Sequence, residues 1–334
     1  MTTLPPLRRS RIVGTGHYLP SHVVTNDDLG KQLDATDDWI YERTGIHLRH
    51  IAADDQVTSD LAVIAVNRAL AMAGCTSTDI DLLVLATITP DMPAPACAAF
   101  VSHKLGMRHV MAFDVTASSA GFIYALSVAD QFLRSRQCTK AVVVGVELLS
   151  RVVDWTDRGT SVLFGDGAGA VVLEACEPGS PGEILSTRCY MDGSAAWMLN
   201  IPGGGSKHPP TTKMVDAKLH TIHMHGPELF KLAIKSLTTA CKSALDHEGL
   251  TPDQVAWVIS HQANRRIIHA VANRVGVPPE RCYINLDRVG NTSAASLPIA
   301  LDEANRAELL RRDSYLLMCA LGAGVAWGSA VVRW

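Results

Sequence analysis

The feature that most constrains the fold is an internal repeat with a spacing of 175 positions, as Ala69 and Ala244 show. Residues 69–84 read ALAMAGCTSTDIDLLV, and residues 244–259 read ALDHEGLTPDQVAWVI. In both segments an alanine-containing stretch typical of a helix stops at a glycine, where a C-cap is expected. A short turn with threonine follows, and then a run of apolar residues that predicts a buried strand. The same landmarks in the same order indicate a duplicated fold.

The two halves also end alike, with GAGAVV at 167–172 and WGSAVV at 327–332. Strands and helices alternate along both, which predicts an α/β fold with parallel or mixed sheets. The Pro- and Gly-rich stretch from Cys176 to Gly182 is the expected linker between the two halves. We therefore expect an N-terminal half at 1–175 and a C-terminal half at 176–334. The loop that begins at Ile201 is expected to cross the surface.

Composition excludes several classes of protein. The formal net charge is −3, so no overall basic field attracts nucleic acid or anionic lipid. No apolar stretch is long enough for a membrane span, and no apolar h-region follows the basic N-terminus, so we expect a cytoplasmic protein. The eight cysteines are scattered without CxxC pairs and are expected to be reduced. His220, His223 and His225 lack a fourth ligand, so no metal is expected.

Residues 111–135 carry the sharpest functional signal. MAFDVT predicts a strand, ASS a tight connection, and AGFIYALSVADQFLRSR a long helix with one apolar face. Ser119 therefore lies near the N-terminus of a largely buried helix, where unpaired N–H groups and the helix dipole favour negative charge. The dipole alone would not ionise a serine hydroxyl, so a nucleophile here would need a general base. Alternatively, Ser118 and Ser119 are only N-caps.

Two later segments place polar residues after predicted strands. VAWVISHQANRR (255–266) predicts a buried strand that ends at His261, and INLDRVGNTSAAS (284–296) predicts a strand end, a glycine turn and then Asn291. Either residue could be structural, as a hydrogen-bonded core histidine or a turn asparagine. The glycine-rich segments 164–170 and 321–328 have neither a dinucleotide nor a P-loop spacing, so no cofactor is expected. Close packing, or a backbone N–H directed at an oxyanion, explains them better.

Taken together, these segments resemble the β-ketoacyl-ACP synthase III family from about Arg11 to Trp334. The motifs that carry the likeness follow the family's order: DDWIYERTGI, DVTASSAGF, DRGTSVLFGDGAG, SHQANRR, GNTSAAS and GAGVAWGSAVVRW. The resemblance implies a thiolase fold of five layers, αβαβα, built from two similar halves and usually found as a homodimer. It also implies an acyltransferase that loads an acyl group from CoA and condenses it with a malonyl thioester, with loss of CO2.

The resemblance further implies roles for individual residues. The family's cysteine, histidine and asparagine fall on Ser119, His261 and Asn291. The backbone N–H groups of Ser119 and Ala323 would form the oxyanion hole, although the family often has glycine at the second position. The residues implied for CoA are Trp39 and Arg158 around the adenine, Arg43 and Thr44 at phosphate, and Phe230 and Asn264 along the pantetheine. The residues implied for an acidic acyl carrier protein are Lys231, Arg265 and Arg266.

The main departure from the family is Ser119, because a thiolate is more available and more nucleophilic toward a thioester. The rest of the site is intact, and Cys→Ser is the smallest change that would trap a substrate. We therefore expect an engineered form with little condensing activity. The alternative is a natural serine enzyme that transfers an acyl group to an alcohol or amine, or joins two carrier-bound chains. A subunit without chemistry would be expected to lack His261 or Asn291, and both are present.

A second departure lies in TPDMPAPAC (89–97). Some acetyl-specific members have a phenylalanine at the position of Ala94, and it closes the acyl pocket across the dimer interface. Alanine would leave room for several more methylene groups. We therefore expect a primer longer or bulkier than acetyl.

Overall fold

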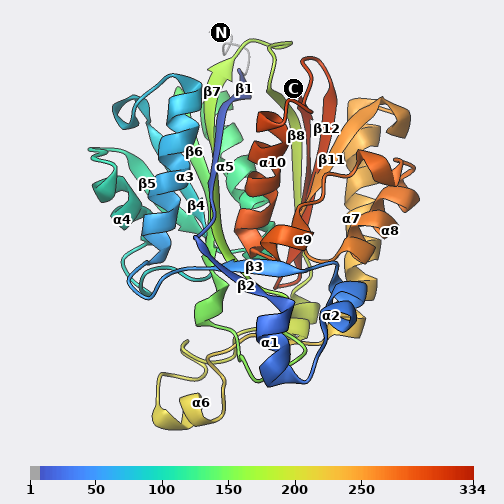
Figure 1. Cartoon of the computed structure of the whole chain (residues 1–334). Coiled ribbons are helices and arrows are strands. Elements are labelled where there is room, and N and C mark those ends of the chain that lie inside the picture. The colour runs from blue at the N-terminus through green and yellow to red at the C-terminus, as the bar shows by residue number, and fades with distance from the viewer. Residues whose placement is uncertain (1–7) are drawn as a thin grey trace.

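A computed structural model describes residues 8–334, and a nine-stranded mixed sheet runs through its centre (Figure 1). The strand order is β11-β12-β13-β8-β1-β7-β6-β4-β5. The strands are β1 (Arg9–Tyr18), β4 (Leu82–Ala86), β5 (Met111–Val115), β6 (Lys140–Leu148), β7 (Asp166–Cys176), β8 (Glu183–Met191), β11 (Val255–Ser260), β12 (Tyr315–Gly322) and β13 (Ala326–Arg333). β4 is parallel to β5 and β6, and β11 is parallel to β12, whereas the other neighbours are antiparallel.

Helices form three layers, with one half of the sheet between each pair of layers (Figure 1). The outer layer on one side holds α3 (Thr58–Ala73) and α4 (Cys97–Lys104), and the outer layer on the other holds α7 (Gly226–Glu248) and α8 (Arg265–Val275). The central layer holds α5 (Gly121–Arg134) and α10 (Ser296–Arg306). This is the five-layer αβαβα arrangement that the family resemblance implied.

The sheet has the same order of elements on both sides of the β1–β8 junction. It runs β1-β7-β6-β4 in one direction and β8-β13-β12-β11 in the other. The outer helices α3 and α7 end at Gly74 and Gly249, whose φ angles of 64° and 65° are the left-handed C-caps expected from the repeat. We propose on this basis that the chain divides into halves at 1–175 and 176–334, at the end of β7 and just before the connection to β8.

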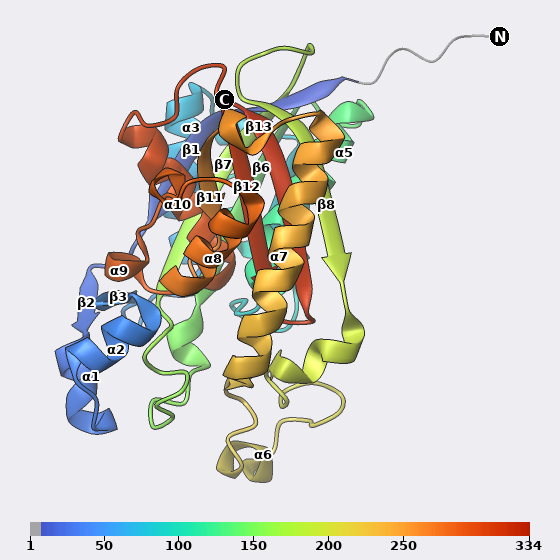
Figure 2. The same ribbon diagram turned by 90° about the vertical axis from the view of Figure 1, so that its right-hand side faces the viewer.

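The smaller elements lie at one end of the sheet (Figures 1 and 2). They are β2 (His22–Thr25), α1 (Asn26–Leu33), α2 (Asp37–Thr44), β3 (Leu48–Ile51), β9 (Leu199–Asn200), α6 (Thr212–Asp216), β10 (His223–Met224) and α9 (Leu286–Val289). The loop that carries α6 projects beyond the body of the molecule, as expected for the segment after Ile201.

Two local expectations need correction. The strand before His261 ends one residue earlier, at Ser260. The segment from Ile284 is not a strand end, because Ile284 and Asn285 belong to no strand and Leu286–Val289 forms the helical turn α9. The nearest β contact is the single bridge between Cys282 and Val258. The side chain of Asn285 donates to Glu303 of α10 at 2.7 Å, which holds the chain where it turns back toward that helix.

All eight cysteines are free thiols, and five of them are buried. Among residues 8–334, no helix is both long enough and apolar enough to cross a membrane.

Candidate active site

Ser119 is buried in a single 3-10 turn (Ser118–Ala120) that leads into α5. The apolar face of α5 is fully buried through Phe122, Leu126 and Leu133, which fixes the position of the turn. The end of β12 packs directly against it: a methyl group added at Gly322 would lie 2.5 Å from the Ser119 nitrogen. Only glycine allows this approach between the two backbones.

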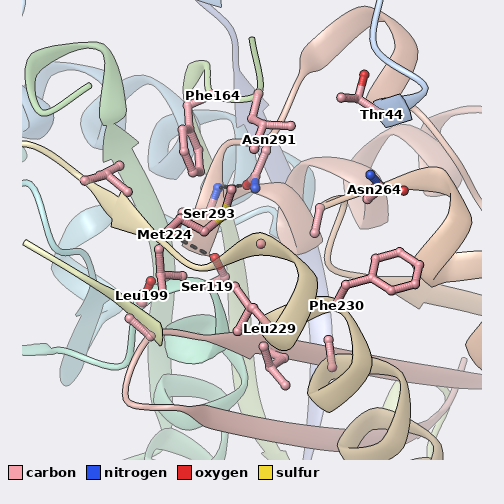
Figure 3. A pocket seen from close by; sticks show the side chains of 18 of the residues that line it. Thr44, Ser119, Phe164, Leu199, Met224, Leu229, Phe230, Asn264, Asn291 and Ser293 are labelled. Atoms are coloured by element: carbon pink, nitrogen blue, oxygen red, sulfur yellow. Dashed lines mark hydrogen bonds between the residues drawn. The ribbon is translucent and has the colours of Figure 1, made fainter. Parts of the chain in front are cut away.

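A second turn of the same kind precedes α10. It spans Ser293–Ala295, and its first residue has a φ of 48°, the same value as Ser118 in the first turn. Ser118 and Ser293 are also 175 positions apart, which is the spacing of the repeat. The two turns are in contact, and the Ser119 hydroxyl donates to the Ser293 hydroxyl at 3.1 Å (Figure 3). The N-cap interpretation is therefore wrong, because neither serine side chain caps α5.

His261 follows β11 directly and is held there by its backbone N–H, which donates to the Cys319 carbonyl at 2.8 Å. Its Nδ1 lies 2.6 Å from the Ser296 hydroxyl. The Gln262 N–H donates to that same hydroxyl oxygen at 3.2 Å, so the Ser296 proton is free to point at Nδ1. Burial lowers the pKa of His261 to about 3, so the ring is neutral at physiological pH. With Nδ1 as acceptor, the ring proton is on Nε2.

Asn291 is held in place by hydrogen bonds of both its backbone and its side chain. Its backbone N–H donates to Leu163 at 2.9 Å, and its carbonyl accepts from Gly165 at 3.0 Å. Its side-chain Oδ1 accepts from the Ser293 N–H at 2.9 Å. Because the oxygen is occupied in this way, the amide NH2 group remains as the available donor.

One cavity of about 500 Å³ brings these residues together. Ser119, His261, Asn291 and Ala323 all line it, and so does Ser293. Most of the remaining lining is apolar, with Leu199, Met224 and Phe164 among its members. In the view of Figure 3, Thr44, Asn264 and Phe230 lie on one side of Ser119, with Leu199 and Met224 on the other. The cavity thus combines a few polar groups with an apolar wall, as small-molecule sites commonly do.

All six residues implied for CoA line this cavity as well: Trp39, Arg43, Thr44, Arg158, Phe230 and Asn264. The Arg158 guanidinium lies 3.7 Å from the centre of the Trp39 ring, and that of Arg43 lies 4.4 Å from it. At 3.7 Å the two stacked groups are in contact, so an adenine enters between Trp39 and Arg158 only if Arg158 moves.

Two of the six have structural partners within the protein. The Thr44 hydroxyl donates to Ile40 at 2.7 Å, so its proton is not free for a phosphate. Asn264 caps α8 by accepting from the Arg266 N–H, and its amide donates to the Arg43 carbonyl at 2.8 Å. Asn264 therefore ties α2 to α8 at the mouth of the cavity.

The three basic residues implied for a carrier protein are not equally available. Lys231 and Arg266 are exposed, and the Arg266 guanidinium lies 5.4 Å from the Phe230 ring centre. Arg265 is half-buried and donates to the Tyr41 hydroxyl at 2.5 Å. Ala94 is exposed and does not line the cavity of the single chain, so the expected role across a dimer interface stays a prediction.

Sequence reasoning assigned no role to Ser293, Ser296 or Glu147. Ser293 and Ser296 lie inside the GNTSAAS motif, and the spacing of 175 from Ser118 was the signal that could have found the first of them. Glu147 lies inside a continuous apolar strand, where one acidic residue is unusual. It is fully buried, and burial raises its pKa to about 7.

Comparisons with known proteins agree on one family. Residues 113–193 match the model of 3-oxoacyl-[acyl-carrier-protein (ACP)] synthase III, and residues 245–334 match its C-terminal model. The chain is 49% identical over 325 residues to a beta-ketoacyl-[acyl-carrier-protein] synthase III of Xanthomonas campestris pv. campestris, covering 97% of this chain and 98% of that protein. A protein of the same name from Caldanaerobacter subterraneus subsp. tengcongensis is 45% identical, with 97% of each chain covered.

Solved structures give the same result. The 3-oxoacyl-[acyl-carrier-protein] synthase III of Aquifex aeolicus VF5 superposes with a TM-score of 0.90 at 42% identity, over 97% of this chain and 100% of that one. The priming beta-ketosynthase of the R1128 polyketide pathway also gives 0.90, at 33% identity, over 98% of this chain and 97% of that one.

Proposed function

The chain belongs to the β-ketoacyl-[acyl-carrier-protein] synthase III family of acyl-transferring condensing enzymes, and we propose that it takes an acyl group from CoA at residue 119 and condenses it with a malonyl thioester. The observation that carries this proposal is the convergence of Ser119, His261 and Asn291 on one cavity. The three residues come from separate segments of the chain, and each is held in place by its own backbone or side-chain contacts.

In the proposed first step, the residue 119 side chain attacks the thioester carbonyl. The negative charge that develops on the carbonyl oxygen would be met by the backbone N–H groups of Ser119 and Ala323, which line the same cavity. The CoA thiolate then leaves, and the acyl group remains on residue 119. The apolar wall near Leu199 and Met224 suits an aliphatic acyl chain.

In the proposed second step, malonyl loses CO2 and its thioester oxygen becomes an enolate. A neutral His261 with its proton on Nε2 and the NH2 group of Asn291 are both donors suited to that oxygen. The enolate carbon then attacks the acyl group on residue 119. Neither donor carries a charge, so the site would stabilise the enolate by directed hydrogen bonds.

Ser119 determines how fast the first step runs, because a serine needs a base that a cysteine thiolate does not. One proposal is that the serine stands in place of a cysteine and leaves little condensing activity. The second is that serine is the working nucleophile of an acyl-transfer or chain-joining enzyme. The hydrogen bond from Ser119 to Ser293 supports the second, since it gives the hydroxyl proton an acceptor.

We further propose the partners of the reaction. CoA would enter past Trp39, Arg43 and Arg158, with its adenine between Trp39 and Arg158 and its phosphate at Arg43. An acidic acyl carrier protein would dock on Lys231 and Arg266, whose side chains are exposed beside the cavity mouth. A cytoplasmic location fits thiols that are all free.

The first test is the intact mass of the protein and of its Ser119→Cys variant after incubation with a series of acyl-CoAs. We expect the Ser119→Cys variant to gain an acyl mass, and the best donor identifies the primer class. Acylation of Ser119 as well would support the natural serine enzyme, whereas its absence would support the substituted form. If neither form is acylated by any acyl-CoA, the proposed function is wrong.

A second measurement separates condensation from simple acyl transfer. Only condensation needs decarboxylation, so we expect the acylated Ser119→Cys variant to release CO2 from malonyl-CoA or malonyl-carrier protein. An acylated enzyme that passes its acyl group to an alcohol or amine, without CO2 release, would support simple acyl transfer instead.

A further inference from the structure

Arg49 is a fully buried cation on β3, behind the wall of the active-site cavity. Its Nη2 donates to the Val162 carbonyl at 2.7 Å, and its Nη1 donates to the Val24 carbonyl at 3.3 Å. Within residues 8–334, the guanidinium forms no ion pair, and its Nε has no hydrogen-bond partner. Burial lowers the pKa of Arg49 to about 10, so the group is still charged at neutral pH.

This arrangement is costly for a residue that only fills space. A buried cation loses its hydration, and hydrogen bonds to neutral carbonyl groups replace that hydration only in part. The charge of Asp37 raises the pKa of Arg49, but burial lowers it by more. An apolar side chain of similar length would occupy the same space without this cost. The segments that the arginine holds therefore bear on its role.

The Val162 carbonyl belongs to the segment that holds Asn291. Phe164 and Asn291 form a parallel β-bridge, and their side chains lie beside one another in Figure 3. In this bridge the Asn291 N–H donates to the Leu163 carbonyl at 2.9 Å, and the Asn291 carbonyl accepts from the Gly165 N–H at 3.0 Å. We call these two hydrogen bonds the Asn291 bridge.

The stem of Arg49 packs against both sides of the Asn291 bridge. A methyl group added at Gly165 would lie 3.0 Å from the Arg49 Cβ, and one added at Gly290 would lie at the same distance. These two glycines are the chain neighbours of Phe164 and Asn291, one on each side of the bridge. Arg49 thus holds the bridge at two points, by packing at its Cβ and by hydrogen bonding at its guanidinium.

We propose that Arg49 is a positioning residue for the second step of the reaction, because it holds the Asn291 bridge and with it the amide that meets the malonyl enolate. The inference rests on the proposed function of the site. Arg49 does not line the cavity, so it acts through Asn291 and does not touch the substrate. The Asn291 amide has no part in the proposed acylation step. Loss of the guanidinium therefore impairs decarboxylation while acylation continues.

Separate rates for the two steps test this role in the Ser119→Cys background. Acylation at saturating acyl-CoA is read by intact mass, and decarboxylation is read by CO2 release from malonyl-CoA. Arg49→Met removes the guanidinium, whereas Arg49→Lys keeps the charge and one donor group. Arg281→Met is the matched control, because Arg281 also donates to two backbone carbonyls, at 2.9 and 3.0 Å, and does not line the cavity. Thermal unfolding checks that each variant is folded.

For Arg49→Met we expect decarboxylation to fall about 10- to 100-fold, the effect of misplacing a catalytic group. Acylation should change less than about threefold, because that step does not use the Asn291 amide. Arg49→Lys should lose less of the decarboxylation rate than Arg49→Met, and Arg281→Met should lose none. In an Asn291→Ala background, Arg49→Met should slow decarboxylation less than about twofold further, because the group that it positions is already gone.

Three kinetic results would overturn the inference. If Arg49→Met slows acylation as much as decarboxylation, the arginine supports the fold and not the asparagine. If it causes its full loss again in the Asn291→Ala background, it acts on another group. If decarboxylation is unchanged in Arg49→Met, the Asn291 bridge keeps its position without the guanidinium.

Hydrogen exchange separates this inference from the proposed function, because exchange needs no catalysis. The N–H groups of Gly165 and Asn291 form the Asn291 bridge, and mass spectrometry of peptides that contain them reports their protection. We expect faster exchange there in Arg49→Met and no change in Arg281→Met. If the Ser119→Cys variant takes no acyl group from any acyl-CoA, the proposed function fails, and faster exchange would still support Arg49 as the residue that holds Asn291. Unchanged exchange in Arg49→Met would overturn the inference whatever the activity of the enzyme.

Discussion

The carboxyl group of Glu147 is held in an environment that penalises its charge, and this has a consequence for stability. Burial raises its pKa from 4.5 to about 7, so between these pH values the folded protein binds more protons than the unfolded chain. Stability from this group is present below pH 4.5 and is lost as the pH rises toward 7, by up to about 3 kcal/mol.

Glu147→Gln should therefore flatten the pH dependence of the free energy of unfolding. Urea titrations at pH 5 and pH 8 would measure the free energy of unfolding at each pH. Between pH 5 and pH 8 the variant should lose less of this free energy than the parent protein. Glu183→Gln should follow the parent. Parallel curves for Glu147→Gln and the parent would contradict the shifted pKa.

Ser296 should affect the second half of the reaction more than the first. Its hydroxyl fixes the His261 ring through Nδ1, so Ser296→Ala frees the ring to rotate. In the Ser119→Cys background we expect malonyl decarboxylation to fall by about 10- to 100-fold, the effect of misplacing a catalytic group. Acylation at residue 119 should change little. Equal losses in both steps would mean that Ser296 supports the fold and not the histidine.

Among the secondary-structure elements, the contact between β12 and the Ser119 turn is the tightest constraint on the site. In Gly322→Ala the new methyl group would lie 2.5 Å from the Ser119 nitrogen and 2.9 Å from the Ala117 carbonyl oxygen. Both are backbone atoms, so the turn must move, at a cost of about 1–3 kcal/mol.

We expect Gly322→Ala, introduced into the Ser119→Cys variant, to slow acylation at least tenfold, because a displaced turn misplaces the nucleophile. Thermal unfolding would report the accompanying loss of stability. Gly193→Ala is the control, since nothing lies within 4 Å of the added methyl group there. Normal acylation in Gly322→Ala would mean that the Ser119 N–H need not keep this position.

The long, strongly patterned elements were predictable from sequence, and the contacts between turns were not. The helix after Ser119 and the caps at Gly74 and Gly249 follow from local patterns, because apolar periodicity and left-handed glycines act over a few residues. The turn α9 was missed, and Asn285, which precedes it, is bonded to Glu303 of α10, 18 residues further along the chain. The bond from Ser119 to Ser293 joins residues 174 apart, which no local pattern encodes.

For the molecule as a whole, the sheet ends in an exposed edge at β5. Met111 on that strand is 48% exposed, and Met92 in the loop beside Ala94 is 44% exposed. An open edge strand with apolar side chains is a common place for a second copy to bind. We propose a homodimer through this edge, and light scattering should give about twice the 35.9 kDa of one chain. A monomer at micromolar concentration would contradict it.

The enzyme's preference for acyl chains of a given length should then depend on the assembled dimer, because Ala94 is exposed and lies outside the cavity of one chain. We propose that Ala94 reaches the partner's acyl pocket and that its small side chain leaves room for a medium-length primer. Each buried methylene group contributes about 0.8 kcal/mol, so a primer longer by three or four of them should be favoured strongly over acetyl.

In the Ser119→Cys background we expect octanoyl-CoA to outcompete acetyl-CoA, and Ala94→Phe to reverse that preference by filling the pocket. Competition between the two donors, read by intact mass, measures the ratio directly. Val215→Phe is the control, because Val215 is exposed on the projecting helix α6 and does not line the cavity of one chain. If acetyl-CoA is already the better donor before the substitution, Ala94 does not set the chain length. If Ala94→Phe leaves the ratio unchanged in a proven dimer, the acyl pocket is closed by the residues of one chain alone.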